Sequence, residues 1–317
     1  MNTPAERPVV LLLQSLVPLI ESKLDDACTV HRLHRAPDRQ AMLADVGPSV
    51  RGVVTGGAIG IKRDLMDALP ALEIVAVHGI GTDAVDLDQA RRRGIRVTTT
   101  PNVLTDDVAD MAIGLLLSTS RRLCTNDRFV RAGQWLTGGV PLARKVTGKR
   151  LGLLGLGRVG RAIAHRAQAF GMAIAYTDVR QFDDVPYRYV PTLDELAGGS
   201  DILVVAASGG PQSKGIVGAA VLDALGRDGI LINVARGSIV DEPALVAALT
   251  EGRLGGAGLD VFADEPRVPD QLLRMDNVVL QPHQASATLE TRIAMGELVL
   301  ANLAAHFAGK PLPTPVV

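Results

Sequence analysis

Three polar residues in the C-terminal part of the chain could together reduce a carbonyl group: Arg236, Glu265 and His283. Each follows closely on a short apolar run that is typical of a buried strand. Reduction by hydride needs a proton donor that titrates near neutral pH, which suits histidine. An arginine offers a planar, bidentate cation to a substrate carboxylate. A carboxylate beside the histidine would stabilise the charged ring and fix its tautomer.

The three residues also have structural interpretations. His283 follows Pro282 and could close a turn at a strand end. Arg236 could pair with Asp241, and Glu265 could cap a helix. The catalytic interpretation is favoured because all three lie in the same part of the chain as a pattern for dinucleotide binding.

That pattern occupies residues 149–178. An apolar run at 151–154 is followed by Gly-Leu-Gly-Arg-Val-Gly at 155–160, which is a G-x-G-x-x-G sequence. A helical pattern then extends to Phe170, and a second apolar run ends at Asp178. Strand, glycine turn, helix, strand and acid together form the full context of a dinucleotide-binding turn. An ordinary strand–helix connection is the alternative.

Each position of the glycine motif has a physical role. Gly155 permits a tight turn, Gly157 lets the backbone approach a pyrophosphate, and Gly160 allows the helix to pack closely on the sheet. Arg158 and Val159 begin the helix, whose free N–H groups attract phosphate. We therefore predict that a nicotinamide dinucleotide binds here.

Two acidic residues refine this prediction. Asp178 could accept hydrogen bonds from both ribose hydroxyls of NAD and would repel the 2′-phosphate of NADP. NAD is therefore favoured, with NADP as the alternative, because Arg180 could bind that phosphate if its loop shifts. Asp260 follows another apolar run and could hold the nicotinamide, unless it is a turn residue.

A possible carboxylate site lies in the first 100 residues. Two glycine-rich segments, Thr-Gly-Gly at 55–57 and His-Gly-Ile-Gly at 78–81, each follow an apolar run. The backbone N–H groups of Gly79, Ile80 and Gly81 could hold the carboxylate of a substrate. A simple tight turn is the alternative. His78 is notable because it precedes this segment, whereas the other histidines apart from His283 have no comparable neighbours.

The alternation of apolar runs and helical patterns predicts an α/β fold with two doubly wound parallel sheets. We expect residues 1–100 and 289–317 to form a substrate-binding, catalytic domain, with a dinucleotide-binding domain of residues 101–288 inserted in it and a cleft between them. Thr105 is the expected N-cap of a long helix over 106–120. Another long helix should span 288–307. The single tryptophan, Trp135, is expected in a core or an interface.

Composition limits the classes of partner. The 317 residues have a net charge of −1 and only 3% aromatic residues, which argues against nucleic acid as a ligand. No apolar run is long enough for a membrane span. The two cysteines, Cys28 and Cys124, have neither metal-binding nor redox spacing. We expect a cytoplasmic protein without a metal centre.

The combination of motifs resembles the D-isomer-specific 2-hydroxyacid dehydrogenases, of the glyoxylate/hydroxypyruvate reductase type. The resemblance covers nearly the whole chain and rests on five segments: TPNVLTDDVAD (100–110), GLGRVG (155–160), INVARGSIVDE (232–242), GAGLDVFADEP (256–266) and NVVLQPHQASAT (277–288). It implies NAD(P)-dependent reduction of a small 2-oxo acid to the D-2-hydroxy acid. It also implies a homodimer formed through the nucleotide-binding domains.

The resemblance assigns roles to individual residues. Arg236 would bind the carboxylate and carbonyl of the 2-oxo acid, and Glu265 would pair with His283, the general acid/base. Ser286 would touch the substrate. Ala235, in the same motif as Arg236, would contact the cofactor.

Two departures from the family pattern concern specificity. The family usually has Ile-Gly after the catalytic histidine, whereas this chain has Gln284-Ala285, which changes the packing there. NADP-preferring relatives commonly have an arginine near the position of Val179 and a neutral residue at that of Asp178.

Other functions remain open from sequence. Formate dehydrogenases resemble this fold but have Gln at the position of Glu265, so Glu265 argues against formate oxidation. Phosphite oxidation is harder to separate. An NAD-sensing regulator or corepressor of the same family could keep all three polar residues.

Overall fold

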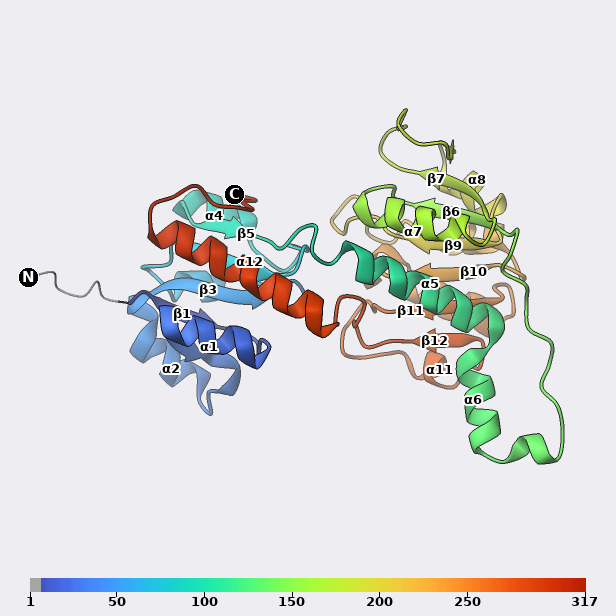
Figure 1. Ribbon diagram of the computed structural model, residues 1–317, viewed down its shortest axis with the longest axis horizontal. Helices are drawn as coiled ribbons and strands as arrows, with labels where there is room; N and C mark the ends of the chain where they lie inside the picture. The colour runs from blue at the N-terminus through green and yellow to red at the C-terminus, as the bar shows by residue number, and fades with distance from the viewer. Residues whose placement is uncertain (1–6) are drawn as a thin grey trace, which may run out of the picture. The chain divides into compact units, whose positions relative to one another are not determined.

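The computed structural model describes residues 7–317, which form two compact α/β units (Figure 1). Unit 1 contains the described residues up to Leu104 and those from Ala287 to Val317, and unit 2 contains Thr105–Ser286. Each unit has its own sheet, in which all strand pairings are parallel. The predicted fold class is confirmed.

Unit 1 is built on a five-stranded sheet in the order β2-β1-β3-β4-β5. Its strands are β1 (Val9–Leu12), β2 (Thr29–Arg32), β3 (Val50–Gly56), β4 (Ile74–His78) and β5 (Arg96–Thr98). Its α-helices are α1 (Pro18–Ala27), α2 (Arg39–Val46), α3 (Arg63–Asp67), α4 (Leu87–Arg93) and α12 (Leu289–Phe307), with 3₁₀ turns η1 (Leu33–Arg35) and η2 (Gly47–Ser49).

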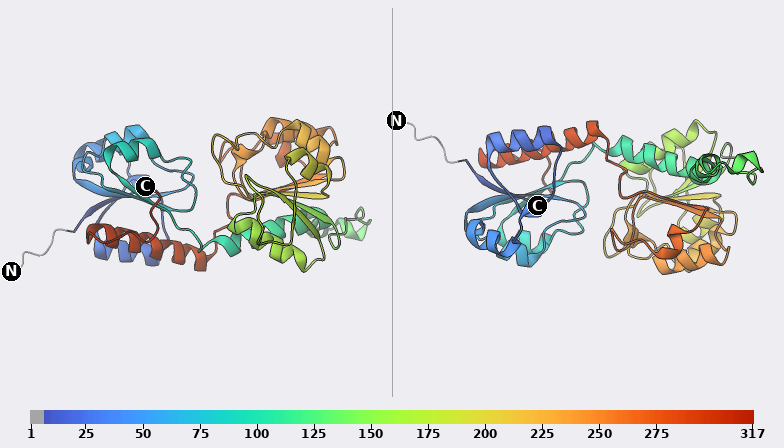
Figure 2. Two further views of the ribbon diagram at one scale, coloured as in Figure 1. Left: turned by 90° about the horizontal axis from the view of Figure 1, so that it is seen from above. Right: turned by 90° about the horizontal axis from the view of Figure 1, so that it is seen from below.

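Helices cover both faces of this sheet (Figure 2). α1 and α12 pack side by side on one face, and α2, α3 and α4 pack on the other. Alternate residues of β4 therefore enter different cores: Ile74 and Ala76 face α1 and α12, and Val75 and Val77 face the opposite layer. Burial on both faces explains the continuous apolar runs in the sequence.

Unit 2 is built on a seven-stranded sheet in the order β12-β11-β10-β9-β6-β7-β8. Its strands are β6 (Arg150–Leu154), β7 (Ala173–Thr177), β8 (Arg188–Tyr189), β9 (Ile202–Val205), β10 (Ile230–Asn233), β11 (Gly256–Leu259) and β12 (Val278–Leu280). Its helices are α5 (Thr105–Arg121), α6 (Leu123–Arg131), η3 (Gln134–Leu136), α7 (Arg158–Gln168), α8 (Leu193–Gly198), α9 (Ala219–Leu225), η4 (Gly237–Ile239), α10 (Glu242–Thr250) and α11 (Asp270–Leu273).

The strand order of unit 2 reverses at β6, which has β7 on one side and β9 on the other. α5 and α7 pack on one face of the sheet, and α8, α9 and α10 pack on the other. The glycine motif directly follows β6, so it lies at the point where the strand order reverses. Ligands of open α/β sheets bind at such points.

One sequence prediction about unit 2 is wrong, and another is narrowed. Thr105 is the first residue of α5 rather than its N-cap, and its buried hydroxyl has no hydrogen-bond partner among residues 7–317. Of the two settings expected for Trp135, the core is excluded because 71% of its surface is exposed, and an interface remains a prediction. Trp135 belongs to a segment, residues 123–142, whose apolar side chains are exposed at Leu123, Val130, Trp135, Leu136, Val140 and Leu142.

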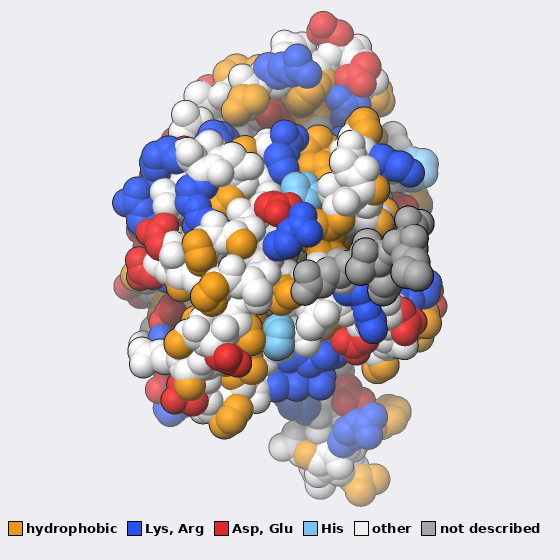
Figure 3. Space-filling model, turned by 90° about the vertical axis from the view of Figure 1, so that its left-hand side faces the viewer, with side chains coloured by type: hydrophobic (Ala, Val, Ile, Leu, Met, Phe, Trp, Pro, Cys, Tyr) orange, Lys and Arg blue, Asp and Glu red, His pale blue; other side chains and the backbone are white. Residues whose placement is uncertain are grey.

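Charges of both signs occur together on the molecule's surface. Acidic and basic side chains are interspersed on the face shown in Figure 3. Among residues 7–317, no helix is both long enough and apolar enough to cross a bilayer.

Candidate active site

The structure brings together Glu265 and His283, which are distant in sequence. Glu265 lies in the loop after β11, and His283 follows β12, the neighbouring strand. The distance between His283 Nδ1 and Glu265 Oε2 is 2.7 Å. The other carboxylate oxygen of Glu265 accepts a hydrogen bond of 3.1 Å from the backbone N–H of Phe262. Both carboxylate oxygens are therefore held in place.

The environment keeps Glu265 ionised. Burial opposes the charge of its carboxylate, but the hydrogen bond and charge of His283, the Phe262 N–H and the charge of Arg236 together lower its pKa. An ionised carboxylate can only accept hydrogen bonds, so Nδ1 of His283 must donate. The ring then has its Nε2 atom left to exchange a proton with a ligand.

A buried acid shapes the turn around His283. The backbone of His283 has a φ of 54°, which is uncommon for a residue other than glycine. Its N–H donates to the carbonyl of Asp260 at 2.8 Å. The Asp260 carboxylate accepts from the N–H groups of Gln284 at 2.7 Å and Ala285 at 2.9 Å. Burial raises the pKa of Asp260 against the effect of these bonds. These contacts are those of a turn residue, and contact with the cofactor remains a prediction.

Arg236 is presented by a turn that Asn233 organises. The buried amide of Asn233 accepts from the N–H of Ala235 at 3.0 Å and donates to the carbonyl of Arg236 at 3.0 Å. A Cβ atom on Gly237 would lie 1.9 Å from the carbonyl carbon of Phe262, so only glycine allows this turn to pack against the loop of Glu265. Sequence reasoning missed Asn233 and Gly237. An asparagine ending an apolar strand beside an Arg-Gly pair was the available signal.

The glycine motif has the geometry that close packing and ligand approach require. Gly155 has a φ of 95°, and a Cβ there would lie 2.8 Å from the backbone of Ala207. A Cβ on Gly160 would lie 2.2 Å from the carbonyl oxygen of Gly155. Around Gly157, by contrast, a Cβ would meet nothing within 4 Å among the described residues. The backbone at the start of α7, at Arg158 and Val159, is thus open to a ligand and fits a dinucleotide pyrophosphate.

Asp178 is tied to this turn. It follows β7, and its two carboxylate oxygens accept from the N–H groups of Leu156 and Val179, both at 2.7 Å. Arg180 places its guanidinium 5.0 Å from the centre of the Phe182 ring. The acid is therefore fixed beside the glycine motif, as a ribose-binding residue must be.

Comparisons with known proteins agree with this geometry. Residues 113–285 match the family model described as "D-isomer specific 2-hydroxyacid dehydrogenase, NAD binding domain". The chain is 46% identical to a 2-ketogluconate reductase of Gluconobacter oxydans, covering 99% of this chain and 100% of that one. It is 49% identical to glyoxylate/hydroxypyruvate reductase A of Arabidopsis thaliana, covering 97% and 98%. The chain belongs to the D-isomer-specific 2-hydroxyacid dehydrogenase family. It is thus an NAD(P)-dependent oxidoreductase.

A solved structure supports the same conclusion. The NADPH-dependent glyoxylate/hydroxypyruvate reductase of Sinorhizobium meliloti, crystallised with NADP and malonate, is 46% identical, with a TM-score of 0.93. The alignment covers 98% of this chain and 97% of that one. The family resemblance and the NAD(P) cofactor predicted from sequence are confirmed.

In this dehydrogenase, the glycine segments of unit 1 offer fewer free backbone N–H groups for a substrate carboxylate than we predicted from the sequence. The N–H of Gly79 donates to the carbonyl of Val77 at 3.0 Å, so it is already used. The N–H groups of Ile80 and Gly81 make no hydrogen bond within residues 7–317. Gly57 packs against this segment, because a Cβ there would lie 3.0 Å from the carbonyl oxygen of Gly81. Two of the three predicted N–H donors are therefore available.

His78 and Ser286 occupy different settings in the dehydrogenase. His78 is buried at the end of β4, and its Nε2 lies 3.3 Å from the carbonyl oxygen of Arg292 in α12. Burial lowers the pKa of His78 to about 4, so the ring is neutral at physiological pH. Its role is to link β4 to α12. Ser286 is partly buried at the end of unit 2, directly after Ala285.

Proposed function

We propose that this dehydrogenase reduces a small 2-oxo acid, such as glyoxylate or hydroxypyruvate, to the D-2-hydroxy acid with His283 as the general acid. The distance of 2.7 Å between His283 Nδ1 and the ionised Glu265 is the observation that most directly supports this role. A histidine held by a carboxylate, in the same unit as an open glycine turn, is suited to proton transfer during reduction.

Residues of unit 2 would hold the cofactor. The backbone at Gly155, Gly157, Arg158, Val159 and Gly160 would bind the pyrophosphate, and Asp178 the ribose. Ala235 and Asp260 would lie against the nicotinamide end. When bound, the reduced cofactor supplies the hydride that forms the new C–H bond at C2 of the substrate.

The remaining steps belong to the side chains and backbone of this chain. Arg236 binds the substrate carboxylate and carbonyl through its planar fork. His283 Nε2 gives its proton to the carbonyl oxygen as that oxygen gains negative charge, and Glu265 stabilises the imidazolium beforehand. The N–H groups of Ile80 and Gly81 are further donors for the carboxylate, and Ser286 contacts the substrate. Unit 1 is the substrate-binding, catalytic domain and unit 2 is the dinucleotide-binding domain.

Steady-state turnover of glyoxylate and hydroxypyruvate, each with NADH and with NADPH, tests this proposal. We expect reduction of at least one of the two acids and recovery of the D-isomer of glycerate from hydroxypyruvate. Cofactor binding without turnover of either acid would contradict the proposal and favour an NAD-sensing regulator. Oxidation of formate or phosphite in place of these reductions would also contradict it.

Asp178 leads us to propose a preference for NAD over NADP, although Arg180 is close enough in sequence to permit NADP. The carboxylate is fixed by two backbone N–H groups, so it cannot easily move away from a 2′-phosphate. Asp178→Asn keeps an acceptor for one of these two N–H groups but removes the negative charge. We expect the ratio of kcat/KM for NADPH to that for NADH to rise about tenfold. An unchanged ratio would remove Asp178 from cofactor selection.

We also propose a cytoplasmic homodimer formed through unit 2. The exposed apolar segment, residues 123–142, supports a partner surface, since Leu136 and Leu142 are 91% and 98% exposed. Both cysteines are free thiols, which suits a reducing compartment, and burial raises the pKa of Cys28 to about 11. The mass in solution should be twice that of the 33.3 kDa chain, and a mass of one chain would contradict the dimer.

A further inference from the structure

Gln14 is an unexplained polar residue at the carboxyl end of unit 1's sheet. It follows β1 and is partly buried, and its carboxamide makes no hydrogen bond with any residue of 7–317. The carboxamide covers Gly56, because a Cβ there would lie 2.0 Å from Gln14 Oε1 and 3.0 Å from Nε2. A partly buried amide that has no protein partner destabilises the folded state unless it binds a ligand or water.

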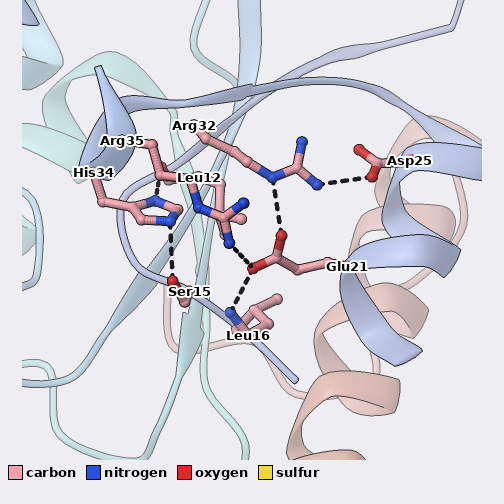
Figure 4. Close-up of polar contacts among 8 residues, drawn as sticks. All are labelled: Leu12, Ser15, Leu16, Glu21, Asp25, Arg32, His34 and Arg35. Atoms are coloured by element: carbon pink, nitrogen blue, oxygen red, sulfur yellow. Dashed lines mark hydrogen bonds and ion pairs between the residues drawn. The ribbon is translucent and has the colours of Figure 1, made fainter. Parts of the chain in front are cut away.

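A polar network fixes the segment that contains Gln14 (Figure 4). His34 contacts the carbonyl of Leu12 through Nδ1 at 3.2 Å and the hydroxyl of Ser15 through Nε2 at 3.0 Å. Glu21 accepts from the N–H of Leu16 at 3.1 Å. The backbone is thus held before and after Gln14.

Glu21 is itself anchored. Its other oxygen accepts from Arg32 Nε at 2.9 Å, and Arg32 also donates to Asp25 at 2.7 Å. Burial opposes ionisation of Glu21, but the arginine contacts and the Leu16 N–H outweigh it and lower its pKa. Because the network is charged and partly buried, it should hold the Gln14 segment in one conformation.

Gln14 shares an edge with the proposed carboxylate donors. β1, β3 and β4 are adjacent, and Gln14, Gly56 and His78 lie at or just after their carboxyl ends. Gly57 in turn packs against the Gly81 carbonyl. A ligand bound to the N–H groups of Ile80 and Gly81 would therefore lie at the same edge of the sheet as the Gln14 carboxamide.

We propose that Gln14 is a specificity-determining residue that hydrogen-bonds a hydroxyl group carried by the substrate beyond its 2-oxo group. The inference rests on the proposed 2-oxo acid reduction. A carboxamide both donates and accepts, as a hydroxyl does, so one group can satisfy the other. The preferred substrates are 2-oxo acids with a hydroxylated side chain. Hydroxypyruvate has such a group, pyruvate has a methyl group in its place, and glyoxylate has only hydrogen.

Gln14→Met tests this assignment, because methionine matches the length of glutamine but cannot form the hydrogen bond. We expect kcat/KM for hydroxypyruvate to fall about tenfold, mainly through KM, with no change for glyoxylate. The preference for hydroxypyruvate over pyruvate should fall with it. Gln40→Met, at an exposed glutamine of α2, is the matched control. It should leave kcat/KM unchanged for hydroxypyruvate, glyoxylate and pyruvate.

Gly56→Ala provides a second test that keeps the glutamine. Its new methyl group would displace the Gln14 carboxamide, so it should reproduce the selective loss on hydroxypyruvate. In the Gln14→Met background, Gly56→Ala should add no further selective loss.

The outcomes separate this inference from the proposed function. Absence of wild-type turnover with all three acids would overturn both. Normal wild-type turnover with an equal loss for all three acids in Gln14→Met would show a packing role and overturn the inference alone. Unchanged kinetics in Gln14→Met would also overturn it alone.

Discussion

Two histidines stand at the carboxyl ends of strands, one in each unit, and their surroundings are opposite. His78 of unit 1 is buried and contacts a neutral carbonyl oxygen of Arg292, and its Nδ1 has no hydrogen-bond partner among residues 7–317. His283 of unit 2 is 36% exposed at its side chain and contacts the Glu265 carboxylate. Burial holds the first ring neutral, whereas the second ring has the ionised carboxylate of Glu265 beside its Nδ1 atom.

The comparison shows that residue type and position on the sheet do not define a general acid. His78 is the last residue of one buried strand, His283 follows another, and both precede turns that could bind a substrate. The partner of the ring makes the difference. His78 bonds to a neutral carbonyl and links β4 to α12, whereas His283 bonds to a carboxylate, as the proposed proton transfer requires.

Of the substitutions that test this comparison, replacement of Glu265, the partner of the His283 ring, should have the largest effect on kcat. Glu265→Gln keeps an acceptor for Nδ1 but removes the charge, so His283 would have a neutral partner as His78 does. We expect kcat for glyoxylate reduction to fall about a thousandfold, because the imidazolium loses its stabilising charge. Unchanged binding of NADH, measured by fluorescence titration, is the control. A loss of only a few-fold would mean that the carboxylate is not needed for proton transfer.

Stability should depend on pH through the other histidine. Between its unfolded pKa of 6.5 and its folded pKa of about 4, His78 binds a proton only in the unfolded chain. The contribution of neutral His78 to the free energy of unfolding is therefore complete above pH 6.5. It is lost as the pH falls towards 4, by about 3 kcal/mol in total.

His78→Gln tests this dependence, since glutamine can still donate to the Arg292 carbonyl but does not titrate. Urea unfolding followed by circular dichroism should show a smaller fall in stability between pH 6.5 and 4 in the variant than in the wild type. The same fall in both proteins would show that His78 is not the titrating group. Activity should fall far less than in variants of Glu265 or His283.

The sequence predicted most of the fold because its signals are local. The G-x-G-x-x-G turn, the acid at Asp178 and the alternation of strands and helices depend on neighbouring residues, and they led to the parallel sheets. The capping of α10 is also local, because Asp241 accepts from the N–H of Ala244, three residues further on. Thr105 was misassigned because a single polar residue before an apolar pattern does not fix where a helix begins.

Contacts between distant segments could not be predicted in the same way. The φ of His283 depends on Asp260, and the packing of Gly237 depends on the backbone of Phe262. The proximity of Gln14 to Gly56 requires β1 and β3 to be neighbours. The use of the Gly79 N–H by Val77 is a detail of backbone conformation that a glycine pattern does not specify.

A single-turnover experiment on His283→Ala tests the central claim most directly. Enzyme loaded with NADH is mixed with glyoxylate, and oxidation of the nicotinamide is followed by absorbance, with NADH affinity measured in parallel. We expect the same affinity as in the wild type and hydride transfer slowed about a thousandfold, because no group delivers the proton. Hydride transfer at the wild-type rate would show that the His283–Glu265 pair is not the acid of this reaction.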